Sequence, residues 1–184
     1  MIKFLEYCKE RNKISKDFDK DNEGRAIINV SIRDKEEVLS PFCYDDKDII
    51  KEEFASHLDN IIKSVPPKQK INLTIKCENL NKNEKDQING AIKNYYKNKI
   101  ADSQLRLKNA YLVFAICVVL SILALGLLFV VHYFNATFIL IEVVDILAWV
   151  FVWEGADILI FQQGIIRMEK ARFTALYNSK INFK

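Results

Sequence analysis

The stretch LVFAICVVLSILALGLLFVV, Leu112–Val131, decides what kind of protein this sequence encodes. All of its residues are apolar or small, and as a helix they extend about 30 Å, the thickness of the hydrocarbon core of a bilayer. Tyr111 and Tyr133 flank the stretch, as aromatic residues do at the two membrane interfaces. The stretch is too long for an ordinary buried helix, so it predicts a transmembrane helix.

A second apolar run, Thr137–Phe161, follows after a short polar break. Because lipid offers no partner to unpaired backbone groups, both runs are expected to be helices, with spans at about 111–133 and 138–161. Basic residues flank the two runs and are absent from the break between them, which predicts a multi-pass protein of the cell membrane with both termini in the cytoplasm. The expected basic anchors at the inner face are Arg106, Lys108, Arg167, Lys170 and Arg172.

The second run carries four acidic residues, Glu142, Asp145, Glu154 and Asp157, although charge is expensive inside a bilayer. Glu142 and Asp157 fall near the two interfaces, and Asp145 and Glu154 lie deeper. At 100° per residue the four occupy about half of the helix surface, and the other half suits lipid. The acids can pair with basic residues at the inner face, move protons or ions, or hold subunits together through hydrogen bonds.

Three residues are candidates for packing between the two predicted spans. Gly126 keeps the first span narrow, which lets a second helix approach closely. Trp149 and Trp153 are separated by one helical turn and share one face of the second span. They either pack against the first span or contact a partner protein.

The segment before the first span holds most of the charged residues and predicts a small soluble domain. RAIINVSIR, Arg25–Arg33, and INLTIKC, Ile71–Cys77, have the composition of strands. The segment between them has helical periodicity, with a start at Asp45 or Asp46 and an end before Pro66. Such a β-α-β unit has parallel strands and a right-handed crossover. A further helix from Asn81 or Asn83 through about Asn109 has no proline before the first span and can run into it.

The predicted fold class is therefore an α+β membrane protein, with a small β-α-β-α cytosolic domain followed by a two-helix transmembrane hairpin. The expected divisions are an N-terminal extension with a short amphipathic helix (1–23), the cytosolic domain (24–109), the hairpin (110–163) and a basic cytosolic tail (164–184). Two strands are too few for an independent sheet. The domain is expected to gain stability from oligomerisation, from the membrane or from further strands.

The sequence lacks the residue patterns of common enzymes. His57 and His132 are the only histidines, the four cysteines form no CxxC pair, and no glycine-rich phosphate loop is present. The acidic loop Val38–Asp48 can hold a cation, but acids before a helix also serve as caps. Mixed charges in the soluble half argue against nucleic-acid binding. We therefore expect a protein that is not an enzyme, with no cofactor and no bound metal.

The order of these segments resembles a group of uncharacterised bacterial inner-membrane proteins with a small N-terminal cytosolic α/β domain and two spans. The likeness covers about Asn29–Arg172 and includes the SPFCYDD loop, the KINLTIK strand and the segment DILAWVFVWEGADILIFQQ. The group offers no known activity, so the resemblance implies architecture and a bacterial inner membrane only.

Two functions are consistent with the sequence. The first is a non-enzymatic membrane protein whose cytosolic domain binds a protein partner and whose transmembrane part anchors it and forms a homo-oligomer. The alternative is a membrane-active effector, or an oligomer that conducts ions or protons under control of the cytosolic domain.

Overall fold

The computed structural model describes residues 19–44, 47–67, 69–77, 80–134 and 137–184. The predicted N-terminal amphipathic helix and the predicted cap at Asp45 or Asp46 lie outside the described residues. The chain divides into two compact units. We call the part up to Ala101, together with Glu169–Lys184, the strand-rich unit, and Asp102–Met168 the helical unit.

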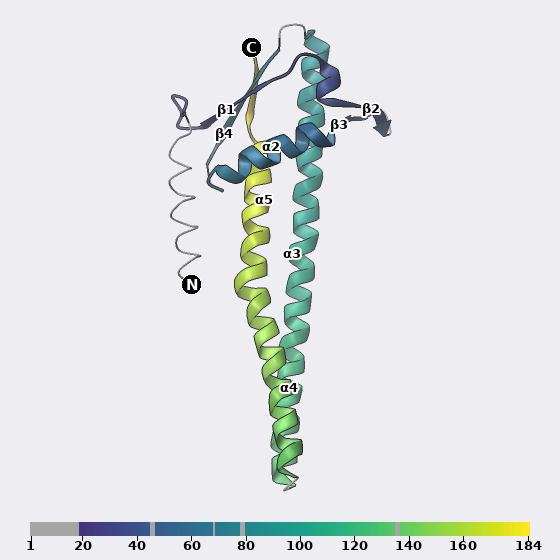
Figure 1. Ribbon diagram of the computed structural model, residues 1–184, viewed down its shortest axis with the longest axis vertical. Coiled ribbons are helices and arrows are strands. Elements are labelled where there is room, and N and C mark those ends of the chain that lie inside the picture. Colours follow the sequence, from purple (N-terminus) through teal and green to yellow (C-terminus); the bar gives the residue numbers. More distant parts are fainter. Residues whose placement is uncertain (1–18, 45–46, 68, 78–79, 135–136) are drawn as a thin grey trace. The chain divides into compact units, whose positions relative to one another are not determined.

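The strand-rich unit is built on a parallel sheet of three strands in the order β1-β4-β5 (Figure 1). Two of them were predicted, and their parallel pairing is confirmed, with Ile28 opposite Leu73. The third comes from the far end of the chain and was not predicted. The bounds are β1 (Ala26–Ser31), β4 (Ile71–Lys76) and β5 (Lys180–Phe183).

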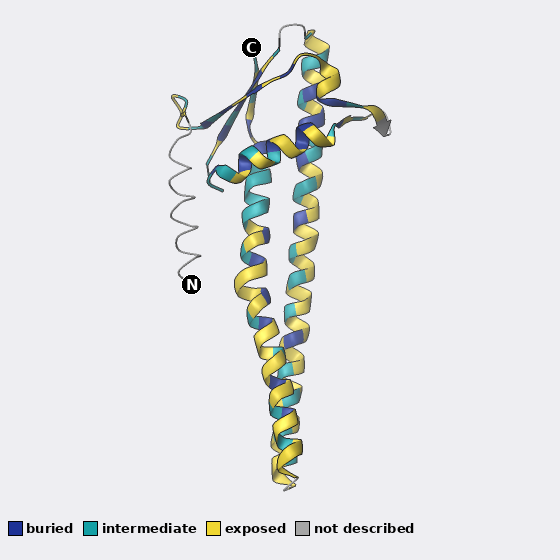
Figure 2. Cartoon of the chain, in the orientation of Figure 1, coloured by how far each residue is buried: buried dark blue, intermediate teal, exposed yellow. Residues whose placement is uncertain are grey.

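The hydrophobic core covers one face of this sheet (Figure 2). Alternate residues of β1 and β4 point into it, as the sequence pattern requires. Helix α2 (Glu52–Ser64), the first turns of α3 (Lys82–Tyr133) and the end of α5 (Gln163–Tyr177) pack on that face. The fully buried side chains include Leu58, Leu73, Ile75, Ile88, Ile92, Tyr96 and Leu176.

A β-hairpin stands where the sequence predicted the start of a helix. Strands β2 (Leu39–Tyr44) and β3 (Lys47–Ile50) pair antiparallel and form their own two-stranded sheet, after the 3-10 turn η1 (Lys35–Glu37). The predicted start of α2 is therefore wrong, because the helix begins at Glu52. The β-branched side chains of Ile49 and Ile50 favour extended backbone, and Ile50 is buried opposite Leu39.

Helix α3 is continuous over 52 residues, which confirms that the helix after β4 runs on through the apolar stretch. At its start the carboxylate of Glu84 accepts a hydrogen bond from the backbone N–H of Asn81, as in a capping box. In the part of the chain that the structure describes, α3 is the one helix that is long and apolar enough to cross a membrane, judged by length and composition.

The predicted fold class is wrong. The chain is mostly helical, with a small strand-rich region, and the expected two-helix transmembrane hairpin is not found, since a single described helix meets the criteria for a span. The physical reason is the acidic content of α4 (Phe138–Asp157), because one Asp at the centre of a span costs about 3 kcal/mol. Helix α4 continues through the π-helical turn η2 (Ile158–Gln162) into α5, and β5 closes the chain.

Candidate functional site

The helical unit is held together by a regular stripe on α3. Between Asp102 and Tyr133, every residue that is not exposed falls on positions that alternate three and four residues apart. This is the spacing that keeps one seam of a helix facing a partner helix. The stripe consists of Ser103, Leu107, Ala110, Phe114, Cys117, Ser121, Ala124, Leu128 and Val131.

Helix α4 carries a matching stripe with the same spacing. Gly155 marks the register of the pair, because a Cβ added there would lie 3.6 Å from the Cβ of Cys117 and 3.7 Å from the ring of Phe114. A glycine and a small thiol thus allow a close approach of the two helices. The stripe on α4 consists of Ile141, Val144, Ala148, Phe151, Gly155 and Ile158.

The four acids lie away from this seam. Glu142, Glu154 and Asp157 are exposed, and Asp145 is half-buried beside the seam residue Val144. On a helical wheel the centre of the four acids is about 180° from the centre of the stripe. The face of α4 that contacts α3 is therefore the apolar one, and the acidic face is left for water, another copy or a partner.

The residues that we expected to pack between the helices are not on the seam. Gly126 is exposed, and no atom lies within 4 Å of the place where its Cβ would stand. Trp149 and Trp153 are 56% and 69% exposed, so neither packs against α3 within one chain. The glycine that does meet a neighbouring helix is Gly155, and its place in a three-four pattern with Val144 and Ala148 was the available signal.

The basic anchors belong to both units. Arg167 donates a hydrogen bond to the hydroxyl of Tyr111, and Asp157 accepts one from Gln162 at 3.2 Å, so this arginine and this acid do not pair with each other. Arg106 and Lys108 are exposed on α3. Lys170 and Arg172 are half-buried on α5 in the strand-rich unit. The five basic residues thus divide between the two units, with Arg106, Lys108 and Arg167 in the helical unit and Lys170 and Arg172 in the strand-rich unit.

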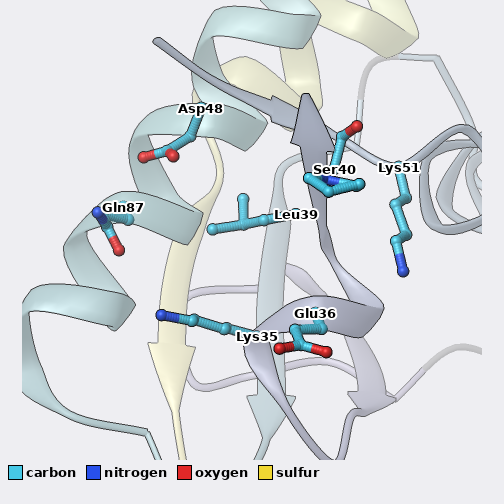
Figure 3. Close-up of a pocket in the computed structure, with 8 residues that line it drawn as sticks. Lys35, Glu36, Leu39, Ser40, Asp48, Lys51 and Gln87 are labelled. Atoms are coloured by element: carbon cyan, nitrogen blue, oxygen red, sulfur yellow. The ribbon is translucent and has the colours of Figure 1, made fainter. Parts of the chain in front are cut away.

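In the strand-rich unit, a groove of about 430 Å³ lies at the base of the β2–β3 hairpin. Figure 3 shows Leu39 in the middle, Asp48 and Gln87 on one side, and Ser40 and Lys51 on the other. Leu39 is buried, and apart from Pro41 the other lining side chains are polar or charged. A smaller hollow of about 330 Å³ shares Asp48 and Gln87 and continues along α3 past Gly90.

An ion pair links η1, which lies beside this groove, to the start of α3. The ammonium of Lys35 lies 3.3 Å from the carboxylate of Glu84 at the start of α3. The backbone N–H of Asn81, and then the Lys35 ammonium, hold the pKa of Glu84 below its ordinary value. Beyond the groove, Phe42 on β2 is 77% exposed. The hairpin thus offers an exposed apolar side chain beside a groove that is lined mostly by polar and charged side chains.

Among the described residues, no group of three His, Cys, Asp or Glu side chains could hold a metal ion. The sequence had marked Val38–Asp48 as an acidic loop that caps a helix or holds a cation. Strand β2 was not predicted from the sequence because it contains Pro41, and proline is disfavoured inside sheets.

No protein-family model matches the chain, and neither a curated protein nor a solved structure shows significant similarity to it. The resemblance to two-span bacterial inner-membrane proteins therefore stays a prediction.

Proposed function

We propose that the protein is a non-enzymatic integral membrane protein, anchored by α3, whose strand-rich unit binds a partner protein in the cytoplasm. The observation that carries the proposal is the exposed apolar surface of α3 between Tyr111 and Tyr133. Large hydrophobic side chains there remain 36% to 75% exposed, on every side except the seam. A surface of this kind is stable in lipid and would aggregate in water.

The pairing of β4 with β5 supports a common side for both parts of the strand-rich unit. Residues 71–76 and 180–183 belong to one sheet, so they have to lie on the same side of a membrane that α3 crosses. The basic residues on either side favour the cytoplasm as that common side. We therefore propose a multi-pass protein with both ends of the described chain in the cytoplasm.

Cysteine labelling in intact cells tests this placement. An impermeant maleimide should label Thr137→Cys without permeabilisation, because Thr137 follows the far end of α3. The matched variant Lys180→Cys, in β5, should be labelled only after permeabilisation. Labelling of both variants in intact cells, or of neither, would contradict the proposal. Alkaline carbonate extraction is the companion measurement, and release of the protein from membranes would reject the anchor itself.

The acidic face of α4 favours assembly of several copies. Glu142, Glu154 and Asp157 are exposed in one chain, and exposed carboxylates are not stable against lipid. We propose that a second copy covers this face, so the protein should be an oligomer in nanodiscs. A monomer, measured by mass photometry, would remove this part of the proposal and leave the anchor untouched.

The same face keeps an alternative function open, an oligomer that conducts ions or protons. The specific observation is that Asp145 is half-buried while three more carboxylates line the same side of α4. Flux into liposomes should fall to the background in Asp145→Asn, which keeps the shape and the assembly. Absence of flux with the unaltered protein would reject conduction.

The hairpin is the proposed site for the protein partner. Phe42 is exposed, and the two-stranded sheet to which it belongs is separate from the three-stranded sheet. A photo-crosslinking amino acid at Phe42 should give one discrete adduct in cells. The same amino acid at Lys63, which is exposed on α2, is the control. Equal adducts at both positions would show that the hairpin has no special role.

A further inference from the structure

A second cavity, of about 810 Å³, lies where the parallel strands of the strand-rich unit end. Strands β1, β4 and β5 run in the same direction, so their carboxyl ends meet at one edge. In sheets of parallel strands, ligands bind outside the carboxyl ends. None of the residues at this edge belongs to the hairpin groove or to the helical unit. The side chains used below are Ser31, Arg33, Asp34, Lys76, Cys77 and Lys184.

Two lysines are neighbours across the sheet at this edge. Ile75 pairs with Phe183, so the residues that follow them stand next to each other, about 4.8 Å apart. Lys76 is the last residue of β4, and Lys184 directly follows β5. Residues in register share a face of the sheet, and both lysines are exposed on the face opposite the core. Like charges at neighbouring positions destabilise a sheet. An anion bound between them would turn that repulsion into attraction.

The same row continues onto β1. Ser31 is in register with Lys76 on its other side and offers a hydroxyl group. Arg33 stands two residues further along and lines the same cavity. Three cationic side chains and a hydroxyl therefore surround the edge, against one acidic side chain, Asp34, among the described lining residues.

Among the residues that the structure describes, none forms an ion pair with these three cations, Arg33, Lys76 and Lys184. Other lysines of this unit are paired, such as Lys35 with Glu84 at 3.3 Å and Lys180 with Glu23 at 3.4 Å. Lys180 is the first residue of β5 and lies on the same face as Lys184, which directly follows this strand, so Lys180 is a matched control.

We infer that this edge of the sheet binds the phosphate group of an anionic ligand. Two ammonium groups supply charge, the Arg33 guanidinium supplies a planar pair of donors, and the Ser31 hydroxyl supplies one more. The phosphate belongs either to a soluble small molecule or to a lipid headgroup, since the chemistry of recognition is the same.

The test uses the full chain in nanodiscs of neutral lipid, titrated calorimetrically with pyrophosphate. Binding should be saturable, and its affinity should fall at least tenfold in the double variant Lys76→Gln, Lys184→Gln. Lys180→Gln should bind as the unaltered protein does. Absence of binding, or an equal loss in Lys180→Gln, would overturn the inference. All three lysines are exposed, so these substitutions leave the core intact.

Cys77 reports the place of binding independently. Its side chain is half-buried at the cavity, and its thiol donates a hydrogen bond to the backbone carbonyl of Arg33 at 3.3 Å. Pyrophosphate should slow alkylation of Cys77, followed by peptide mass spectrometry. Binding without any change at Cys77 would place the anion elsewhere and reject this site. Nanodiscs with anionic lipid identify the source, since headgroups in the site would weaken pyrophosphate binding, whereas a site for soluble ligands would bind it unchanged.

Discussion

Helix α3 belongs to both units, and its buried residues differ between them. In the strand-rich unit it buries Ile88, Ile92 and Tyr96, which are all 0% exposed. In the helical unit its seam is made largely of small residues, among them Ser103, Cys117 and Ser121. Removal of large apolar side chains from water drives the first kind of packing. In lipid that gain is absent, so close contact between narrow helix surfaces has to replace it.

The largest expected effect comes from a cavity in the strand-rich unit. Ile92→Ala should lower the free energy of unfolding of this unit by about 3 kcal/mol, because it leaves an unfilled space in the core. Leu105→Ala is the control on the same helix, since Leu105 is 60% exposed and should change little. Thermal unfolding in detergent, followed by limited proteolysis of the strand-rich unit, measures both. Equal losses of unfolding free energy in the two variants would show that burial of large side chains is not what stabilises α3 in the strand-rich unit.

Replacement of a small residue by a large one tests the helical unit. Gly155→Leu should destabilise the α3–α4 pair by about 2 kcal/mol, because a large side chain collides with Cys117 and Phe114. Gly155→Ala should be tolerated, since its Cβ would stand at ordinary contact distances of 3.6 Å and more. Gly126→Leu should also be tolerated, because the space around Gly126 is open.

A disulfide gives a direct measurement of the same contact. The Cβ position of residue 155 is 3.6 Å from the Cβ of Cys117, within the range that a disulfide needs. Gly155→Cys should therefore cross-link to Cys117 on mild oxidation, and Gly126→Cys should not. Peptide mapping identifies the bond. A free Cys117 in oxidised Gly155→Cys would contradict the register of the seam.

The sequence predicted those parts of the fold whose signals are local. The alternation in Ala26–Ser31 and Ile71–Lys76 identified two strands, and the unbroken helical pattern identified α3. Strand β5 was missed because Lys180–Phe183 is short and pairs with a strand about a hundred residues earlier, which no local pattern reveals. The same holds for the cationic edge, since only the β4–β5 register brings Lys184 beside Lys76.

The acids of α4 show a different limit. Their common face could be read from the spacing of Glu142, Asp145, Glu154 and Asp157. Which face meets α3 was not predicted. The spacing of Val144, Ala148 and Gly155 is visible in the sequence, but the fit of these residues depends on the partner helix.

A pH-dependent effect of moderate size is expected at the contact between α2 and α3. The buried Tyr96 hydroxyl donates to the Asp59 carboxylate at 3.0 Å. Burial raises the pKa of Asp59 above its ordinary value of 3.8, and the bond from Tyr96 partly opposes this. A raised pKa in the folded state means that the contribution of Asp59 to stability is fully present below pH 3.8 and is lost as the pH rises through the folded pKa.

Tyr96→Phe should therefore cost about 1.5 kcal/mol at neutral pH and less in acid, where Asp59 is protonated and uncharged. Asp59→Asn keeps an acceptor for Tyr96 and removes the charge, so it should be as stable as the unaltered protein or more so at neutral pH. The stabilities of Asp59→Asn and of the unaltered protein should become equal below pH 3.8. Unfolding curves across this pH range provide the measurement. A cost of Tyr96→Phe that is independent of pH would show that the carboxylate is not involved.

The smallest expected effect concerns Gly24, and it completes the contrast between the units. Gly24 has a φ of 72°, in the left-handed region, and no atom lies within 4 Å of the place where its Cβ would stand. Its role is thus conformational, whereas that of Gly155 is spatial. The turn is closed by Asp21, whose carboxylate accepts hydrogen bonds from the backbone N–H groups of Glu23 and Arg25, each at 2.9 Å. Gly24→Ala should cost about 1 kcal/mol through backbone strain alone. Gly24→Asn should cost less, because asparagine adopts this conformation more readily.

At Gly155 the order of the two substitutions should reverse, with alanine tolerated and the larger, polar asparagine destabilising. Melting temperatures of the four variants decide the matter. Alanine that is harmless at Gly24 would show that this glycine is not needed for its conformation, and asparagine that is harmless at Gly155 would show that this glycine is not needed for its small size.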